Sequence, residues 1–322
     1  MDCGQRLMIG FDGTAMNRDI EHAVVDVGVG GMILFSRNIA SPEQAAALCA
    51  DIQDLARRHG KPPLFIAVDQ EGGQVARFRK PFTEFRGNPF METPAEAERF
   101  AGIVSRELRS VGVNMNFAPV VDCIPEGFDG IMAGRVFKGA PERVALMGAT
   151  VIEGFQQNGL MAVAKHFPGI GRTVLDSHLD LPRLDVDQAE MARTDLIPFV
   201  KAIEAGVSGI MLSHILYTAI DPLWPASLSE VISRQWLRQV LGYPGLIMTD
   251  DLDMGAVAKH YPLETAVLQA AAADVDLMLI CHWGPNIDAA FELLQTFSKT
   301  HPEMMAASLQ RIATAKSGWL MR

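Results

Sequence analysis

Residues 162–178 read AVAKHFPGIGRTVLDSH: a short apolar run ends in a lysine and a histidine and opens into a loop that contains two glycines. Similar runs rich in Val, Ile, Leu and Met recur along the chain. Their continuous apolarity is typical of parallel strands that are buried on both faces of a sheet. Eight such runs are predicted as strands, at 7–11, 31–35, 64–69, 114–122, 162–166, 209–214, 246–250 and 276–282.

Amphipathic stretches lie between these runs, and four of them are predicted as helices, at 42–59, 94–111, 190–205 and 264–273. Strand alternating with helix, repeated eight times, predicts an α/β protein of the (β/α)8 TIM-barrel type. Barrels of this type often run past about 250 residues as one domain. Because low-complexity segments and Ser/Gly linkers are absent, residues 1–322 are expected to form a single domain.

Charge and composition exclude several classes of binding partner. The formal net charge is −10, whereas nucleic acids and anionic membranes bind proteins with a basic surface, so neither is expected to bind. No window is apolar over the roughly 20 residues that a membrane span needs, and the first residues, MDCGQRLMIGFDG, lack the pattern of a signal peptide. We expect a soluble cytoplasmic protein, with a monomer as the default. Its scattered cysteines show neither a disulfide framework nor a paired zinc spacing: Cys3, Cys49, Cys123 and Cys281.

Several of the predicted strands end in polar or ionisable residues, in the motifs VDQEGG, PVVD, KHFPG, LSH, MTDD and LICH. In these barrels the C-terminal ends of the strands and the loops after them hold the active site. A polar residue at one strand-to-loop transition is ordinary. Its repetition on so many strands predicts that these residues converge on one mouth.

The loop after the fifth predicted strand carries the densest set of reactive groups. Asp176 and His178 lie two residues apart, so in an extended segment both side chains fall on one side. A carboxylate beside an imidazole fixes its tautomer and suits proton transfer near neutral pH. The alternative is a loop in which both side chains only bond the backbone. Strand alternation predicts that the adjacent Lys165 and His166 do not both point into the mouth in the same way.

The stretch 248–254, MTDDLDM, presents acids at the end of the seventh strand. An aspartate there can act as a nucleophile toward an electrophilic centre. Asp250 and Asp251 are consecutive, so only one is expected to face the ligand. Asp251 and Asp253 are expected to be helix-capping or solvated acids.

The stretch 68–77, VDQEGGQVAR, follows the third strand. Asp69 is predicted to accept hydrogen bonds from ligand hydroxyls, and Glu71 is equally a candidate carboxylate of the reaction. Arg135 offers a fork of donors to a polar ligand, although an isolated arginine is more often part of a surface ion pair. Asp122 and His214 are either mouth residues or supports for them, and the supporting role is favoured.

Together these motifs resemble glycoside hydrolase family 3, and in particular its single-domain bacterial β-N-acetylglucosaminidases. The similarity rests on VDQEGGQVARF, KHFPGIGRTVLDSH and TDDLDM, in this order along the chain, and it extends to GGMILFSRN, HILYTAIDPLWPASLS and SLQRIATAK. The resemblance implies a (β/α)8 barrel that hydrolyses β-linked N-acetylglucosamine with retention of configuration. It implies a small carbohydrate substrate, such as a peptidoglycan fragment, and no cofactor or metal.

The resemblance also implies roles for individual residues. Asp250 would be the nucleophile that forms the glycosyl-enzyme, and His178 would be the general acid and then the general base, assisted by Asp176. Five further residues would bind the N-acetylglucosamine ring: Asp69, Arg77, Arg135, Lys165 and His166. The sequence departs from the family pattern at Ile170, where histidine is common, and at Arg172, where a smaller or acidic residue is common.

Three alternatives remain open from the residues alone. His166, His178, His214, Asp69 and Asp250 are candidate ligands for a metal-dependent barrel hydrolase, although no HxH pair ends the first strand. A family 3 enzyme with another sugar specificity is a second possibility. The third is a barrel that binds sugar without turnover.

Overall fold

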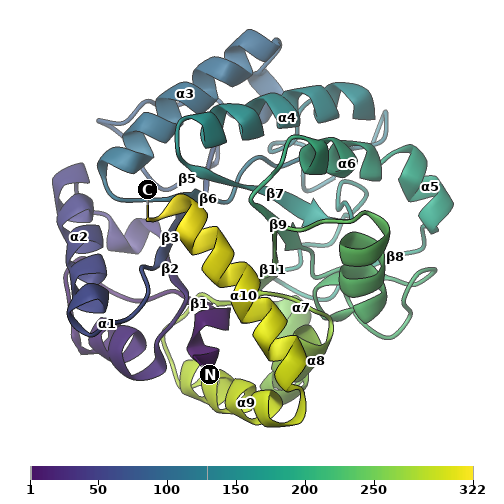
Figure 1. Cartoon of the computed structure of the whole chain (residues 1–322). Coiled ribbons are helices and arrows are strands. Elements are labelled where there is room, and N and C mark those ends of the chain that lie inside the picture. Colours follow the sequence, from purple (N-terminus) through teal and green to yellow (C-terminus); the bar gives the residue numbers. More distant parts are fainter. Residues whose placement is uncertain (1, 129, 322) are drawn as a thin grey trace.

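The computed structural model describes residues 2–128 and 130–321, which form a closed barrel of eight parallel strands. The strand order around the barrel is β1-β12-β11-β9-β7-β6-β3-β2, so neighbours in the sequence are neighbours in the barrel. Helices surround it, as Figure 1 shows. The predicted fold class is confirmed, and each of the eight predicted runs contains or overlaps one barrel strand.

The barrel strands are β1 (Leu7–Ile9), β2 (Gly31–Leu34), β3 (Phe65–Val68), β6 (Met115–Asn116), β7 (Met161–Phe167), β9 (Gly209–Leu212), β11 (Leu246–Asp251) and β12 (Leu277–Ile280). Two small sheets lie outside the barrel: β4 (Gln70–Gly72) with β5 (Val75–Ala76), and β8 (Arg183–Leu184) with β10 (Leu216–Tyr217).

The α-helices are α1 (Arg18–His22), α2 (Pro42–Arg58), α3 (Pro94–Ser110), α4 (Pro141–Gln157), α5 (Gln188–Arg193), α6 (Leu196–Glu204), α7 (Gly255–Ala258), α8 (Leu263–Ala272), α9 (Asn286–Thr300) and α10 (Pro302–Trp319). Wider π-type turns form Ala23–Val27 and Val231–Val240. Short 3₁₀ turns form Cys3–Arg6, Ser36–Asn38, Asn88–Phe90 and Ala226–Leu228. Among the described helices, none is long and apolar enough to cross a membrane.

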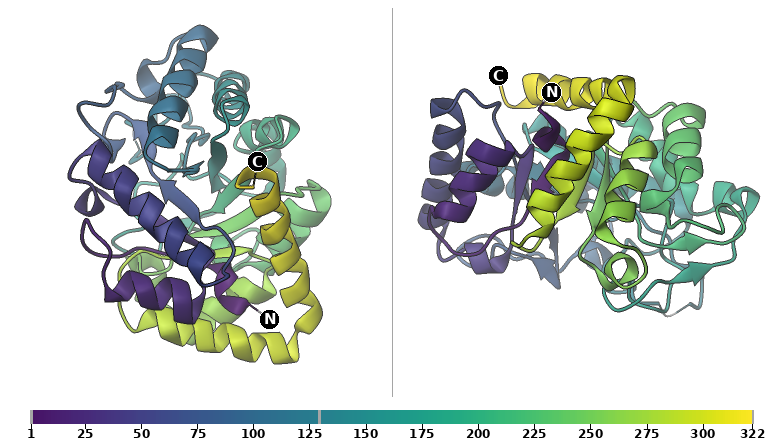
Figure 2. Two further views of the ribbon diagram at one scale, coloured as in Figure 1. Left: turned by 60° about the vertical axis from the view of Figure 1, so that its left-hand side comes forward. Right: turned by 90° about the horizontal axis from the view of Figure 1, so that it is seen from below.

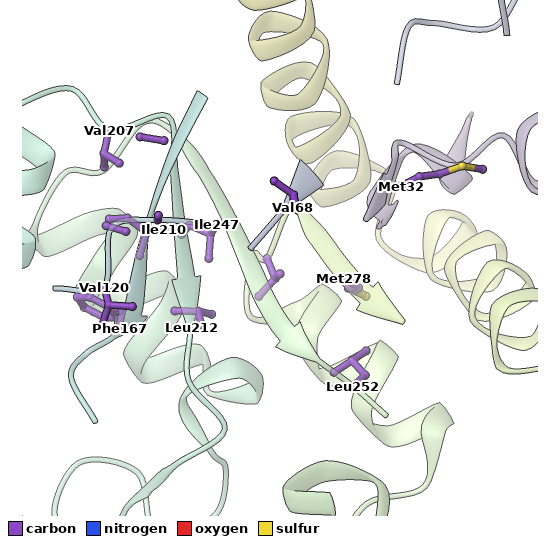
Figure 3. Packing of buried hydrophobic residues seen from close by; sticks show 14 of the residues in the cluster. Met32, Val68, Val120, Phe167, Val207, Ile210, Leu212, Ile247, Leu252 and Met278 are labelled. Atoms are coloured by element: carbon purple, nitrogen blue, oxygen red, sulfur yellow. The ribbon is translucent and has the colours of Figure 1, made fainter. Parts of the chain in front are cut away.

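Apolar side chains pack on both faces of the barrel strands, which explains the continuous apolar runs. An inner cluster fills the barrel and includes Met8, Phe65, Met161 and Met248. A larger outer cluster lies between the strands and the helices. Figure 3 shows part of this outer cluster, with Val68 of β3, Ile210 of β9 and Ile247 of β11 among its labelled members.

The last helix, α10, closes one end of the barrel, and Figures 1 and 2 show it lying across that end. Ile312 belongs to the inner cluster, and Trp319 packs against it. Lys316 is buried there; its Nζ donates a hydrogen bond to Oε1 of Gln5 at 2.6 Å and lies 5.1 Å from the ring centre of Phe65. The candidate active site lies at the opposite end, where the strands finish.

The single helix predicted at 190–205 is wrong, because the structure has two helices there, α5 and α6, separated at Thr194. Thr194 leaves the helical region, with φ −138° and ψ −83°. Pro198 has no N–H to bond the carbonyl of Thr194, so a continuous helix would lose this bond. The chain instead begins a new helix with Pro198 in its first turn, where proline is tolerated.

Candidate active site

A pocket of about 170 Å³ opens at the C-terminal ends of the barrel strands. All eight residues predicted for the site line it, although they come from five separate parts of the chain. They are Asp69, Arg77, Arg135, Lys165, His166, Asp176, His178 and Asp250. The structure thus confirms that these residues converge, whereas their roles remain to be tested.

The buried Lys165 ammonium is the centre of an ion-pair network at the base of the pocket. Its Nζ lies 2.7 Å from Oδ1 of Asp69 and 2.7 Å from Oε1 of Glu71. Arg135 binds both carboxylate oxygens of Glu71, at 2.7 and 3.0 Å, and Arg77 reaches Asp69 at 3.3 Å. Each buried charge is therefore compensated, which is the condition for keeping it ionised away from water.

The pKa values of this network favour the charged forms. Burial alone would raise the pKa of Asp69, but Lys165 and Arg77 outweigh it and lower that pKa to about 2. Burial would also lower the pKa of Lys165, yet Asp69 and Glu71 raise it above its usual value. The network is thus a fixed array of charges at neutral pH.

Glu71 does not line the pocket, so the structure does not support it as a carboxylate of the reaction. Only 2% of its side chain is exposed, and both oxygens are occupied by Lys165 and Arg135. It orients these two cations instead. Arg135, in turn, is not part of a surface ion pair, because its fork is engaged at the buried carboxylate.

Lys165 and His166 both line the pocket, contrary to the prediction from strand alternation. The pairing of β7 with β9 shifts register between Lys165 and Phe167, which breaks the alternation at this point. His166 is fixed by Asp122, whose Oδ2 lies 2.8 Å from Nδ1 of the imidazole. Asp122 also accepts a hydrogen bond from the backbone N–H of Ile170 at 2.9 Å, so it holds the start of the loop as well.

Asp250 is half-buried at the end of β11 and faces two imidazoles. Burial would raise the pKa of its carboxyl, but His166 and His214 outweigh that effect and lower it. The backbone N–H of Asp251 donates to Oδ1 of Asp250 at 2.9 Å. An ionised carboxylate that lines the pocket and has one oxygen held by the backbone has the character of a nucleophile.

Asp122 and His214 support the pocket rather than line it, as predicted. Nδ1 of His214 lies 2.6 Å from the hydroxyl of Ser227, and its Nε2 lies 2.9 Å from the carbonyl oxygen of Asp251. Burial lowers the pKa of His214, although Asp250 opposes this shift.

Asp251 and Asp253 are neither helix caps nor solvated acids, so this expectation is wrong. Both side chains are largely buried, and Asp253 accepts hydrogen bonds from the backbone N–H of His282 at 3.3 Å and from Nδ2 of Asn286 at 3.0 Å. Oδ1 of Asp251 accepts hydrogen bonds from the backbone N–H of Asp253 at 3.1 Å and of Cys281 at 3.0 Å. It therefore ties the loop after β11 to the end of β12. Burial is the main reason that its pKa is raised to about 6, and the neighbouring carboxylates Asp253 and Asp250 add to the shift.

The predicted Asp176–His178 pair is present, but a turn rather than an extended segment forms it. The backbone N–H of Leu179 donates to the carbonyl oxygen of Asp176 at 2.9 Å, which closes the turn. Oδ1 of Asp176 accepts from the backbone N–H of His178 at 2.9 Å and lies 2.7 Å from Nδ1 of its ring. Burial opposes ionisation of Asp176, but these hydrogen bonds lower its pKa.

The two departures from the family pattern have different surroundings. Ile170 lines the pocket, whereas Arg172 turns to the α5–α6 junction. Arg172 pairs with Glu190 at 2.8 Å and with Asp195 at 3.2 Å, and it donates to the hydroxyl of Thr194 at 3.0 Å. Arg172 therefore anchors the base of the loop to its neighbouring helices.

The ligand set of the metal-dependent alternative is not assembled. Within residues 2–128 and 130–321, the one group of three side chains placed to share an ion is Asp251, Asp253 and His282. None of the five proposed ligands belongs to this group. Both ring nitrogens of His214 are engaged, by the hydroxyl of Ser227 and the carbonyl oxygen of Asp251, so it has no nitrogen left for an ion.

Sequence reasoning missed the apolar lining of the pocket. Ile33, Phe117, Met211 and Leu279 line it from the barrel interior, and Phe35 lies near its rim with Arg37 and Arg77 packed over the ring at 4.5 and 5.4 Å. The alternation of inward and outward residues within each strand is the signal that identifies the first four.

Known proteins resemble this chain in sequence and in fold. The sequence pattern of the glycosyl hydrolase family 3 N-terminal domain matches residues 2–315. A beta-hexosaminidase of Alkalilimnicola ehrlichii is 39% identical over 89% of this chain and 84% of its own length. A beta-hexosaminidase of Thiobacillus denitrificans is 36% identical over 95% of this chain and 85% of its own length.

Solved structures agree with these matches. A family 3 β-N-acetylglucosaminidase from Paenibacillus sp. str. FPU-7 superposes with a TM-score of 0.95 at 36% identity. The match covers 98% of this chain and 61% of that chain, so the present chain spans about three fifths of its length. A β-N-acetylhexosaminidase from Beutenbergia cavernae DSM 12333 gives a TM-score of 0.88 at 27% identity, over 98% and 97% of the two chains.

A closed barrel with a charged pocket at the C-terminal ends of its strands is typical of a barrel enzyme. The comparisons then give the family: the chain belongs to glycoside hydrolase family 3. It is therefore a glycoside hydrolase, as the resemblance predicted.

Proposed function

We propose that this protein is a retaining β-N-acetylglucosaminidase that removes terminal β-linked N-acetylglucosamine. One observation carries the proposal: an ionised aspartate, Asp250, and a carboxylate–imidazole pair, Asp176–His178, line the same small pocket. Retaining hydrolysis needs one nucleophile and one group that donates and then accepts a proton. The names of the beta-hexosaminidase and β-N-acetylglucosaminidase relatives support the choice of sugar.

In the first step, Oδ2 of Asp250 attacks the anomeric carbon while the bond from that carbon to the departing oxygen breaks. His178 protonates the departing oxygen from Nε2, because its Nδ1 is held by Asp176. In the second step, His178 takes a proton from water. The water oxygen then bonds to the anomeric carbon, and the ester bond to Asp250 breaks.

Asp69, Arg77, Arg135, Lys165 and His166 bind the sugar ring in this proposal. Asp69 supplies carboxylate oxygens, and the cations around it supply donors, so the array suits a ring with several hydroxyls. Because the ion pairs are already formed, the donors need little reorganisation when the sugar enters.

We further propose that the natural substrates are peptidoglycan fragments, hydrolysed in the cytoplasm by a monomer. The remainder of such a substrate carries carboxylates, which an imidazole acid repels less than a second carboxylate would. Arg77 lines the pocket, and its contact to Asp69 is 3.3 Å long, so its guanidinium can also bind a carboxylate of the substrate. Cys49, Cys123 and Cys281 are buried thiols, which suits a reducing compartment.

The experiment compares 4-nitrophenyl β-N-acetylglucosaminide with the matching β-glucoside, using the wild type, Asp250→Ala and the exposed-site control Asp51→Ala. We expect release from the N-acetyl substrate only, abolished by Asp250→Ala and retained by Asp51→Ala. A denatured complex carrying one added sugar, detected by mass spectrometry on Asp250, would identify the covalent intermediate. Equal activity on both sugars, or activity that survives in Asp250→Ala, contradicts the proposal.

The metal-dependent alternative makes a different prediction, because its activity would fall on dialysis against a chelator. We expect the rate to be unchanged by such treatment. Binding of N-acetylglucosamine without turnover would instead support the inactive sugar-binding alternative.

A further inference from the structure

The segment that follows Asp250 also holds the turn that carries His178. Four consecutive residues of the turn, 177–180, each accept a hydrogen bond from the segment 255–260. Two of the donors are backbone N–H groups of that segment, and the other two are its side chains. The pairs are Ala256 N to Ser177 O at 3.0 Å, Gly255 N to His178 O at 3.2 Å, Lys259 Nζ to Leu179 O at 2.8 Å, and His260 Nε2 to Asp180 Oδ1 at 2.5 Å.

The backbone part of this contact depends on a glycine. A Cβ atom at Gly255 would lie 2.7 Å from the carbonyl oxygens of both His178 and Leu179. Real Cβ atoms do not approach backbone oxygens this closely, so any larger residue would displace the turn. The turn therefore packs directly on the first residues of α7.

Within residues 2–128 and 130–321, apolar packing adds little to these hydrogen bonds and to those inside the turn. His178 exposes 68% of its side chain and Leu179 is 63% exposed, so apolar burial contributes little at these positions. Leu181 is the nearest buried side chain in the sequence, in a small cluster with Leu216 and Ala256. The hydrogen bonds from segment 255–260 therefore help to fix the position of the His178 imidazole.

We propose that Lys259 and His260 are positioning residues for the acid/base group. They hold the 176–180 turn on α7 and so fix the imidazole of His178 relative to Asp250. This inference rests on the proposed function, in which His178 is the acid/base. Lys259 and His260 act through the turn, because their polar atoms contact Leu179 and Asp180 rather than the pocket. One short segment, 250–260, then carries the nucleophile at one end and the support of its partner at the other.

The test uses the dependence of the rate on the leaving group. A nitrophenolate leaves with little protonation, whereas the methoxide of methyl β-N-acetylglucosaminide needs the acid. The variants are Lys259→Met, His260→Ala and the double variant, with His260→Gln to retain a donor toward Asp180. Lys299→Met and His59→Ala are matched controls at exposed positions. The quantity measured is kcat/KM, which reports the steps up to the glycosyl-enzyme.

We expect kcat/KM for the methyl glycoside to fall about 10-fold in each single variant and about 100-fold in the double variant, within the range of general acid catalysis. The value for the nitrophenyl glycoside should change less than about 3-fold, because that step needs little acid. His260→Gln should recover most of the loss, and the controls should resemble the wild type. The midpoint of urea unfolding, measured for each variant, separates positioning from general loss of structure.

Equal losses on the two substrates, or no loss on either, would overturn the inference. His178→Ala is measured alongside to separate this failure from failure of the proposed function. If His178→Ala loses activity selectively on the methyl glycoside while the Lys259 and His260 variants do not, only the positioning roles are wrong. If His178→Ala shows no selectivity, the acid/base assignment is wrong and the inference falls with it.

Discussion

The Nδ1 atom of His178 lies 2.7 Å from Oδ1 of Asp176, in a turn that leaves 68% of the imidazole side chain and 45% of the aspartate side chain exposed. The same oxygen also accepts the backbone N–H of His178. One carboxylate oxygen therefore sets both the turn and the ring orientation. Because the pair is exposed to solvent, the protein contributes mainly by fixing the orientation of the imidazole and not by burying it.

Asp176→Asn should keep the turn and lose the charge, because an amide oxygen still accepts the backbone N–H of His178. We expect kcat to fall about 10- to 100-fold, since the imidazolium loses its stabilising partner. Steady-state kinetics on the nitrophenyl and methyl glycosides checks this, with Asp51→Asn as an exposed control. A change in kcat of less than twofold on both substrates would show that Asp176 does not assist His178.

Lys165→Met should destabilise the fold as well as abolish activity, because Asp69 and Glu71 would remain buried without their shared cation. Breaking a buried ion pair by removing one partner costs about 3–5 kcal/mol of the free energy of unfolding. Urea unfolding measures it. The control is Lys201→Met, which removes an exposed pair with Glu204 and should cost less than about 1 kcal/mol.

A second substitution tests the physical cause of that loss. Adding Asp69→Asn to Lys165→Met removes the carboxylate left with only the 3.3 Å contact to Arg77, and it should recover part of the free energy of unfolding. A double variant less stable than Lys165→Met would contradict the compensation of charge described for this network.

Asp251→Asn should stabilise the protein at neutral pH. The pKa of Asp251 is about 6 in the folded protein and 3.8 in a free carboxyl, so its contribution to stability is full below pH 3.8 and is lost as the pH rises through 6. The difference in free energy of unfolding between variant and wild type should therefore grow by roughly 2–3 kcal/mol from pH 4 to pH 7.5. Denaturation at these two pH values measures it. A difference that does not change with pH would mean that Asp251 has an ordinary pKa.

Arg172→Ala should loosen the base of the loop that carries Asp176 and His178. Asp195, whose pKa burial already raises, would lose its cation, and the link from the loop to Glu190 would be lost. We expect faster amide hydrogen exchange over 170–180 and a loss of about 1–3 kcal/mol in the free energy of unfolding. Arg143→Ala, which removes bonds to backbone carbonyls elsewhere, is the control. Unchanged exchange over 170–180 would show that the loop does not depend on this anchor.

The strands and the membership of the pocket were predictable from the sequence for a physical reason. A parallel barrel buries both faces of each strand, so its strands are continuous apolar runs, and its loops carry the polar residues that finish them. Asp69, Lys165 and Asp250 each stand at such a boundary. Their convergence follows from the closure of the barrel alone.

The corrected predictions concern contacts between residues that are distant in the sequence or depend on local turns. Nothing near Glu71 in the chain indicates that Lys165 and Arg135 occupy it. The backbone N–H of Cys281, 30 positions away, decides the surroundings of Asp251. The spacing of Asp176 and His178 fits a turn as well as an extended segment, so spacing alone cannot distinguish the two.

The closure of one barrel end by α10 limits how the enzyme can work along a polymer. The inner cluster fills the barrel, and Ile312 and Trp319 of α10 complete it at the end opposite the pocket, so a chain of sugars cannot pass through the barrel. The released monosaccharide must leave through the same opening that admits the next substrate. Under the proposed function we therefore expect one sugar to be released at each encounter, and free N-acetylglucosamine to compete with the substrate for the pocket.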